Sequence, residues 1–263
     1  MKEQLLAFRE KGFFRMPEPL LSAQLIEEVS ELQKGVETKW EAMEFPGMNR
    51  LACQFLMVLK ESPALMAAVE HAPTLSLAAE LLGVDTRGVG GNPQGALVIE
   101  ACGLGDHPGH WHSNSTADLA FRTALDPQGL GTKTAGLRVL PGSHLRSFEE
   151  VTAELRAIPG NEEGEMFATH PEEQTVPLDP ESHVVWSPSV WHATELQPSP
   201  DAPRRTIGWN YGVAGKTRTR DAAAVKFIFD GVWQKWSQAR QKLFGVYDEE
   251  AGSDDARSGV ARL

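Results

Sequence analysis

The sequence predicts a mainly β protein, in which helices pack against one antiparallel barrel or sandwich. Residues 1–87 carry apolar side chains at helical spacing, broken by prolines that are typical of helix starts. From residue 88 on, glycine-rich turns alternate with short runs of β-branched and aromatic residues, the pattern of strands. A chain of 263 residues can form all of this as a single domain.

The front segment predicts short helices at residues 2–11, 23–34, 63–71 and 73–83. Gly12 ends the first of these, and residues 13–16 then look extended. Ser22 is a good N-cap for the second helix. Residues 35–50 predict an ordered loop that carries Trp40, and residues 51–59 fit either a strand or a helix.

The barrel core is expected within residues 88–215, with strands after the turn-rich stretch 88–96 and at 136–140, 183–186 and 206–211. Residues 146–181 are rich in proline and glutamate and predict a helix followed by a long loop. Such insertions are often functional lids. Residues 226–244, within a C-terminal segment 221–247, predict one amphipathic helix. Residues 248–263 predict a flexible, charged tail.

Charge and composition exclude several classes of partner. The formal net charge of −11 argues against nucleic acid or an anionic membrane surface, because both require a basic footprint. No apolar run approaches membrane-spanning length, and the charged N-terminus lacks the apolar core of a signal peptide. Cys53 and Cys102 form no CxxC motif, which favours buried thiols in a reducing cytoplasm. We therefore expect a cytoplasmic protein that acts on a small molecule; its oligomeric state is open.

The residues that could carry chemistry follow two β-rich runs. His107, His110 and His112 come soon after the strand-like run that begins at Leu97, and His192 follows another such run. A single histidine is most simply a satisfied core or surface residue. Two histidines delivered by separate strands, with Arg204 opening the next strand, suit a metal that also binds an anionic bidentate ligand. The guanidinium group would hold the far carboxylate of that ligand.

Several stretches, in order along the chain, resemble the phytanoyl-CoA dioxygenase (PhyH) family of iron(II)/2-oxoglutarate oxygenases. They are FREKGFFRMPEPLLSAQLIEEV, ESPALMAAVEHAPTLSLAAELLGVD, GLRVLPGSHL, and SHVVWSPSVWHATEL followed by PRRTIGWNYG. The resemblance implies a double-stranded β-helix, a cupin-like jelly roll, flanked by helices. It also implies an enzyme that uses Fe(II), 2-oxoglutarate and O₂ to hydroxylate or otherwise oxidise a small organic molecule.

The resemblance also implies roles for individual residues. His112 matches the proximal metal histidine of the family and His192 the distal one. Arg204 matches the residue that binds the distal carboxylate of 2-oxoglutarate. Arg205 competes for that role, because alternation along a strand would turn only one of the two inward.

Other residues are weaker candidates. Trp111 and Trp191 adjoin the two histidines and are expected to line the substrate pocket. Arg122 and Arg138 could meet an anionic substrate, although pairing at the surface is the simpler role. The acidic run Glu162, Glu163 and Glu165 is most simply a solvated face of the lid.

The sequence departs from the family at the third metal ligand. The family motif is His-x-Asp, whereas this chain has His112-Ser113-Asn114. An asparagine offers only a neutral oxygen, so the site would hold Fe(II) more weakly. The residues that could replace it are Asp106 and Asp118 with a carboxylate, and His107 and His110 with an imidazole.

Other readings of Asn114 stay open. The side chain fills the space that related halogenases leave for a halide, which disfavours halogenation. An inactivated Asp→Asn form would have this same sequence. The principal alternative to the oxygenase is a catalytically silent jelly roll that binds a small ligand without redox turnover.

Overall fold

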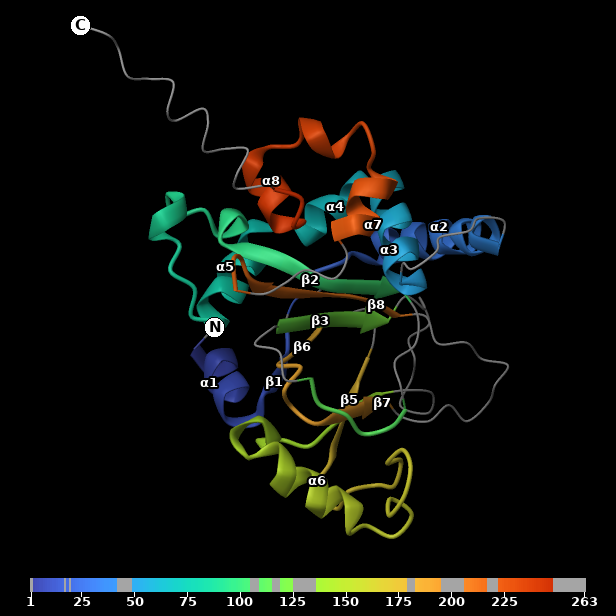
Figure 1. Ribbon diagram of the computed structural model, residues 1–263, viewed down its shortest axis with the longest axis vertical. Coiled ribbons are helices and arrows are strands. Elements are labelled where there is room, and N and C mark those ends of the chain that lie inside the picture. The colour runs from blue at the N-terminus through green and yellow to red at the C-terminus, as the bar shows by residue number, and fades with distance from the viewer. Residues whose placement is uncertain are drawn as a thin grey trace, which may run out of the picture.

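The computed structural model in Figure 1 describes residues 2–16, 18, 20–41, 49–104, 109–114, 119–124, 136–178, 183–194, 206–216 and 222–247. Within these ranges, the side chains of residues 37–41, 100–104, 119 and 121–124 lie outside the description. The tail 248–263 lies wholly outside it.

Two antiparallel sheets form the centre of the molecule. The first has the strand order β1-β6-β3-β8-β2 and the second the order β5-β4-β7. The strands of the first sheet are β1 (Phe13–Arg15), β2 (Leu97–Leu104), β3 (Leu119–Ala124), β6 (Val184–Trp186) and β8 (Thr206–Val213). Those of the second are β4 (Gly136–Val139), β5 (Gln174–Pro177) and β7 (His192–Thr194).

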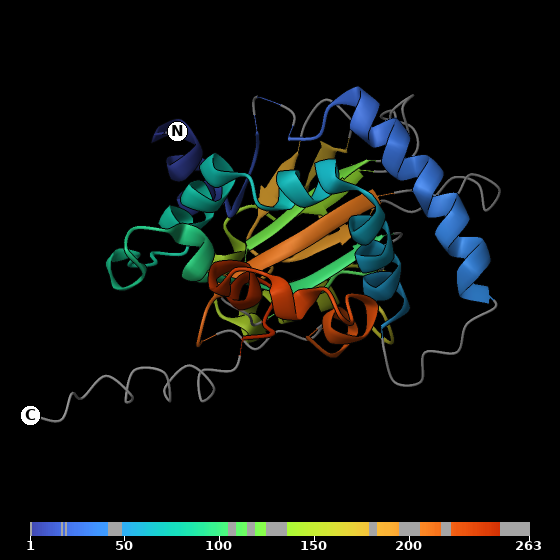
Figure 2. The ribbon, with the colours of Figure 1, turned by 90° about the horizontal axis from the view of Figure 1, so that it is seen from above.

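Helices cover the outer faces of both sheets. The five-stranded sheet is covered by α2 (Ala23–Glu41), α3 (Arg50–Glu61), α4 (Pro63–Val69), α7 (Ala222–Ile228) and α8 (Gln238–Leu243), which lie above it in Figure 1. In Figure 2, which is seen from above, these helices lie in front of the sheet and α2 runs along one side. The helices α1 (Lys2–Lys11) and α5 (Ala72–Leu81) flank them. Below the three-stranded sheet lies α6 (Phe148–Arg156). Short 3₁₀ turns complete the described elements, at Arg87–Val89, Pro93–Gly95, Ser143–Leu145 and Trp233–Lys235.

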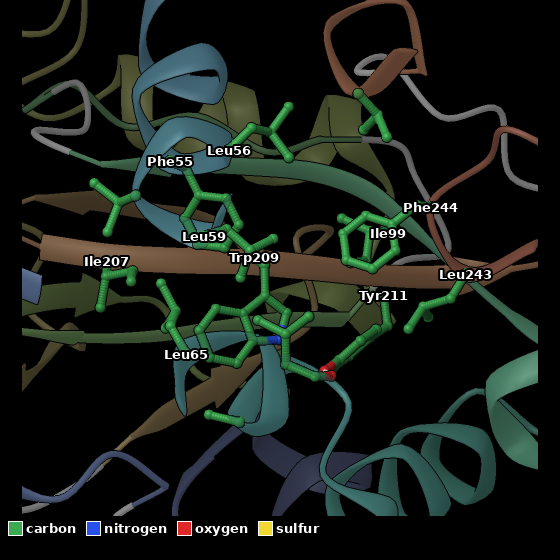
Figure 3. Packing of buried hydrophobic residues seen from close by; sticks show 14 of the residues in the cluster. Phe55, Leu56, Leu59, Leu65, Ile99, Ile207, Trp209, Tyr211, Leu243 and Phe244 are labelled. Atoms are coloured by element: carbon green, nitrogen blue, oxygen red, sulfur yellow. The ribbon is translucent and has the colours of Figure 1, made fainter. Parts of the chain in front are cut away.

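The described residues form three apolar cores, which lie between the upper helices and the first sheet, between the two sheets, and between the second sheet and α6. The helix-side core lies between the helices and β8, where Phe55 of α3 meets Trp209 with ring centroids 6.2 Å apart (Figure 3). The inter-sheet core joins both sheets through residues such as Trp186 of β6 and Val139 of β4. The α6 core lies beneath the second sheet and contains Trp111 and Val151.

Strand alternation determines which residues of β8 face each layer. Ile207, Trp209 and Tyr211 belong to the helix-side core. Asn210 pairs with Ala120, which belongs to the inter-sheet core. Because side chains alternate along a strand, the even-numbered positions of β8 face the second sheet.

Most predicted elements of the front segment are confirmed, one open choice is decided, and one helix end needs correction. Residues 51–59 form a helix, which Asn49 caps by accepting hydrogen bonds from two backbone amides. The helix that begins after Ser22 does not end at residue 34 but continues to residue 41, through the predicted loop. Gly35 costs this helix only about 1 kcal/mol relative to alanine, and the buried Val36 continues its apolar stripe.

The back segment differs from the prediction at three places, the first of which is strand β3, which was not predicted. The insertion 146–181 contains α6 but also β5, which pairs with β4. The single C-terminal helix is wrong: α7 ends at Ile228, and Gly231 adopts a positive φ of 70° that stops the helix. Ser237 then caps the separate helix α8 by accepting a hydrogen bond from the Arg240 amide.

Among the described residues, no single helix is long and apolar enough to cross a membrane. One pair of helical segments, Arg50–Glu61 and Pro63–Leu81, reaches the required length and composition together, but the pair is bent by 115°.

Candidate functional site

The two candidate metal histidines lie directly opposite each other. His112 and His192 form an antiparallel bridge, in which the amide of each donates to the carbonyl of the other at 2.9 Å. Residues paired in this way point to the same face of a sheet. Their ring centroids are 4.2 Å apart. The structure therefore places these two histidines side by side from separate segments.

Both imidazole rings are held in the same orientation relative to the backbone. His112 Nδ1 lies 3.0 Å from the carbonyl oxygen of His110, and His192 Nδ1 lies 2.7 Å from that of Val190. A carbonyl can only accept, so each Nδ1 carries a proton, and in the neutral ring Nε2 is then the unprotonated nitrogen. Histidines that bind a metal through one nitrogen commonly donate from the other in this way.

The pair faces the space between the two sheets. His192 is opposite Val139 in the β4–β7 ladder, and Val139 belongs to the inter-sheet core. The ring of Trp186 packs against His192 with centroids 5.8 Å apart. His192 is consequently buried, whereas His112 is only half-buried and gives the pair access to the outside.

Hydroxyl groups fasten the backbone around the pair. Ser113 Oγ donates a hydrogen bond to the carbonyl of Ser189, and the backbone N–H of Asn114 donates one to the carbonyl of Pro188, both at 2.8 Å. On the other side, Ser143 Oγ accepts from the Trp191 amide at 2.8 Å. These contacts explain the PGSH turn as a support for the strand of His192. The sequence signal for this support was Ser143 in the PGSH motif, and the structure shows that this serine is buried.

The structure corrects the prediction that Trp111 and Trp191 line the substrate pocket. Both are buried in the α6 core, on the face opposite the histidines, because neighbouring residues of an extended chain point to opposite sides. Trp111 Nε1 donates to the carbonyl of Ala168, and Trp191 packs against Phe148 of α6. These side chains support the backbone of the site from behind.

Arg138 is likewise a buried residue rather than a surface one. Its guanidinium group binds both carboxylate oxygens of Glu173 and donates to the carbonyls of Phe167 and Ala168. It also lies over the Trp111 ring, 4.8 Å from its centroid. The contacts with Glu173, Phe167 and Ala168 tie the loop after α6 to β4.

Of the candidate third ligands, Asn114 and His110 lie among the described residues. Asn114 is exposed, two residues beyond His112 on the same strand-like segment. Among the described residues, no three His, Cys, Asp or Glu side chains form a group that could hold a metal ion. His110 therefore does not complete such a group with His112 and His192 in this structure. Asp106, His107 and Asp118 lie outside the described ranges.

The residues predicted to bind 2-oxoglutarate or substrate are described only in part. Arg204 and Arg205 lie outside the described residues, as does the side chain of Arg122. The backbone of Arg122 lies in β3, paired with Gly208 of β8. A cavity of about 710 Å³ is lined by Val98, Val213, Lys216, Lys242 and Tyr247 among others, and its lining includes neither histidine.

Two titratable side chains near these elements have shifted pKa values for structural reasons. Burial lowers the pKa of His144, whose ring lies beside the Arg9 carbonyl and not at the histidine pair. Burial raises the pKa of Tyr211, whose hydroxyl donates to the carbonyl of Val69 at 2.5 Å. Tyr211 therefore acts as a neutral anchor between β8 and α4.

Comparison with solved structures identifies the fold. The non-haem α-ketoglutarate-dependent carbocyclase SnoK from nogalamycin biosynthesis matches with a TM-score of 0.55 at 19% identity, over 84% of this chain and 88% of that one. The epimerase SnoN, in complex with Fe³⁺, α-ketoglutarate and nogalamycin RO, matches with a TM-score of 0.51 at 19% identity, over 87% and 89%. The protein has the fold of these non-haem enzymes.

A third neighbour agrees with this result. EctD from S. alaskensis with bound Fe matches with a TM-score of 0.52 at 18% identity, over 84% of this chain and 79% of that one. The sequence itself matches no family model and no curated protein. The resemblance to the phytanoyl-CoA dioxygenases in particular therefore stays a prediction.

Proposed function

We propose that this protein is an Fe(II)/2-oxoglutarate-dependent oxygenase of the phytanoyl-CoA dioxygenase type that oxidises a small organic molecule. The observation that carries the proposal is the histidine pair. Two imidazoles from separate segments lie with their ring centroids 4.2 Å apart, and a backbone carbonyl accepts from each Nδ1, which leaves Nε2 of the neutral ring to bind a metal. Fold neighbours that work with iron and α-ketoglutarate add support.

The donor set fits a weakly held divalent iron. His112 and His192 would each bind it through Nε2, and the side-chain oxygen of Asn114 is the nearest substitute for the family's carboxylate. The bound metal would supply the reactivity toward O₂ that side chains lack. The protein's own contribution is to orient the two imidazoles through their Nδ1 hydrogen bonds and to keep water from the inter-sheet side with Trp186.

Strand parity supports Arg204 over Arg205 as the residue that binds 2-oxoglutarate. The even-numbered positions of β8, such as Asn210, face the second sheet and thus the same interior as His192. Arg204 lies two residues before Thr206 in the sequence and so shares that parity. Its guanidinium group would bind the distal carboxylate as a bidentate pair.

We extend the proposal to the architecture. Two antiparallel sheets that enclose an apolar core, with helices outside both, fit a double-stranded β-helix. The histidine pair would then lie inside the jelly roll, beside the apolar inter-sheet core.

One observation favours a second candidate function. Asn114 stands where a carboxylate is needed, and its side chain is exposed. A jelly roll that has lost the charged ligand could bind a small molecule between its sheets without redox turnover. This catalytically silent protein is the alternative.

An anaerobic titration tests the proposal. Metal-free protein receives Fe(II) and then 2-oxoglutarate, and the visible charge-transfer band of the iron–2-oxoglutarate chelate is recorded before and after O₂ is admitted. We expect a band that requires both additions and fades with O₂. The variant Arg204→Ala should lose the band, whereas the matched variant Arg205→Ala should keep it.

The other outcomes are equally informative. Loss of the band in Arg205→Ala alone would move the binding role to Arg205. No band in the wild-type protein, together with no metal binding by calorimetry, would reject the oxygenase and leave the silent jelly roll.

A further inference from the structure

A segment of the loop after α6 lies along the histidine segment. The Trp111 amide donates to the carbonyl of Met166 at 2.7 Å, and Trp111 Nε1 donates to that of Ala168 at 2.9 Å. Burial alternates along this segment: Met166 belongs to the α6 core, while Glu165 and Phe167 are exposed. The two exposed side chains therefore project from the face opposite the core.

Buried polar contacts hold this segment in place. Asn161, which is fully buried, accepts a hydrogen bond from the Ala168 amide and donates one to the carbonyl of Leu155. Arg138, bound to Glu173, donates to the carbonyls of Phe167 and Ala168. Glu165 and Phe167 thus stand on a backbone that is fixed from both sides, as a specificity element requires.

Both exposed side chains meet His110, next to the metal pair. The Phe167 ring lies edge-on to the His110 ring, at 88° with centroids 6.1 Å apart. Glu165 Oε1 lies 3.5 Å from His110 Nδ1. The His110 ring is in turn 5.4 Å from that of His112. Glu165, Phe167 and His110, which we call the entrance wall, are therefore continuous with the proposed metal site.

The carboxylate of Glu165 retains capacity for a ligand. Its side chain is 63% exposed, and its contact with His110 is long for a hydrogen bond. The nearby arginines among the described residues bind elsewhere: Arg138 to Glu173, Arg146 to Glu154 and Arg156 to the Asn161 carbonyl.

We propose that the entrance wall selects the substrate, which is a small organic molecule with an amine or hydroxyl group attached to an apolar ring or chain. The polar group would donate a hydrogen bond to Glu165, and the apolar part would pack on the Phe167 ring. An apolar surface with a few placed polar groups is the usual composition of a ligand site. The proposal rests on the proposed function, because it takes the space beside His112 as the place of reaction.

Three probes that share a phenyl group test the wall. They are 2-phenylethylamine, 2-phenylethanol and 3-phenylpropanoate, whose binding to metal-free full-length protein is titrated by ligand-observed NMR. We expect the amine and the alcohol to bind at least about fivefold more tightly than the carboxylate. Glu165→Gln should reduce the preference for the amine about threefold or more, and Phe167→Ala should weaken the two favoured probes.

Matched controls separate the wall from general effects. Glu163→Gln removes the same charge from an exposed position of the same loop, and Phe227→Ala removes an exposed ring from α7. Both should leave probe binding unchanged. Phe167→Leu keeps an apolar side chain and should retain part of the binding that Phe167→Ala loses. A smaller effect of Glu165→Gln on the alcohol than on the amine would identify the amine as the preferred group, and the reverse would identify the hydroxyl.

Paramagnetic Mn(II) distinguishes failure of this inference from failure of the proposed function. Mn(II) bound by His112 and His192 should broaden the probe signals, and His192→Ala should abolish the broadening. Selective probe binding without any Mn(II) binding would reject the metal site and leave the wall standing. Equal binding of the carboxylate probe, an equal loss in Glu163→Gln, or no measurable binding of any probe would overturn the wall.

Discussion

At the scale of single residues, the site depends on alternation along short extended segments. His112 and His192 point between the sheets because their neighbours, Trp111 and Trp191, point into the α6 core. A carbonyl two residues earlier then sets the ring orientation of each histidine. Under the proposed function, the same alternation, continued to residue 114, would make the metal affinity depend on Asn114.

Replacing Asn114 with aspartate tests this dependence. The added carboxylate supplies one negative charge beside the two imidazoles, so Asn114→Asp should tighten Fe(II) binding by about tenfold or more, corresponding to about 1.4 kcal/mol. It should also raise the rate of 2-oxoglutarate turnover. Calorimetry with Fe(II) under anaerobic conditions measures the first effect, and succinate formation measures the second.

Asn92→Asp provides a matched control, because Asn92 caps a short 3₁₀ turn elsewhere and aspartate can accept the same amide hydrogen bond. It should leave Fe(II) affinity unchanged. An unchanged affinity in Asn114→Asp would mean that this side chain does not face the metal.

At the scale of elements, capping residues determine where helices begin, and tertiary contacts determine how far the helices continue. Ser147 and Glu150 form a reciprocal capping box at the start of α6. The Glu154 carboxylate further along α6 binds Arg146 and lies 2.9 Å from His170 Nε2. Helix α6 is thereby tied to the loop that carries the entrance wall.

The Glu154 contacts predict a pH dependence of stability. The hydrogen bond from Arg146, and to a smaller extent that from His170, holds the pKa of Glu154 below its ordinary value of 4.5. A carboxyl group with a lowered pKa in the folded state stabilises the protein above its unfolded-state pKa, and this contribution is lost as the pH falls through the lowered value. Glu154→Gln should therefore reduce the melting temperature at pH 7, and the difference from wild type should shrink below about pH 4.5.

Thermal unfolding between pH 3 and pH 7 measures this difference. Glu149→Gln removes an exposed carboxyl group from the first turn of the same helix and is the control. For Glu149→Gln, the difference in melting temperature from wild type should not shrink comparably below about pH 4.5. A constant difference for Glu154→Gln over the whole range would contradict the assignment.

At the scale of the whole molecule, the helix-side core is the largest of the three and unites helices from both ends of the chain with the five-stranded sheet. Phe55 of α3 is fully buried there against Trp209, as Figure 3 shows. Arg240 of α8 also binds Glu70, just after α4. These contacts make the helical cover part of the folded unit that holds the sheets.

Phe55→Ala should lower the free energy of unfolding by about 3–5 kcal/mol, because it leaves a large cavity in this core. Urea unfolding followed by far-UV circular dichroism measures the loss. Leu51→Ala, at a more exposed position of the same helix, should change the free energy by only about 0.5 kcal/mol. Similar effects of the two substitutions would show that Phe55 is not packed as the structure indicates.

Much of the fold was predictable because its signals are local. Proline at helix starts, Ser22 as an N-cap and β-branched runs each act within a few residues. The errors arose where a local signal was weak. Gly35 did not stop α2, because buried Val36 outweighs a modest propensity cost. In the C-terminal segment, the positive φ of Gly231 divided a pattern that periodicity alone joins.

The sequence by itself determined the two histidines, the asparagine two residues after one of them, and most helices of the front segment, because residue identity and periodicity are properties of the chain. Only the tertiary structure decided that Trp111 and Trp191 stand behind the site and that Glu165 and Phe167 stand beside His110. These placements depend on which face of each segment meets another layer. Contacts between residues more than 50 positions apart, such as that of Trp111 with Ala168 at a separation of 57, leave no periodic signal in the sequence.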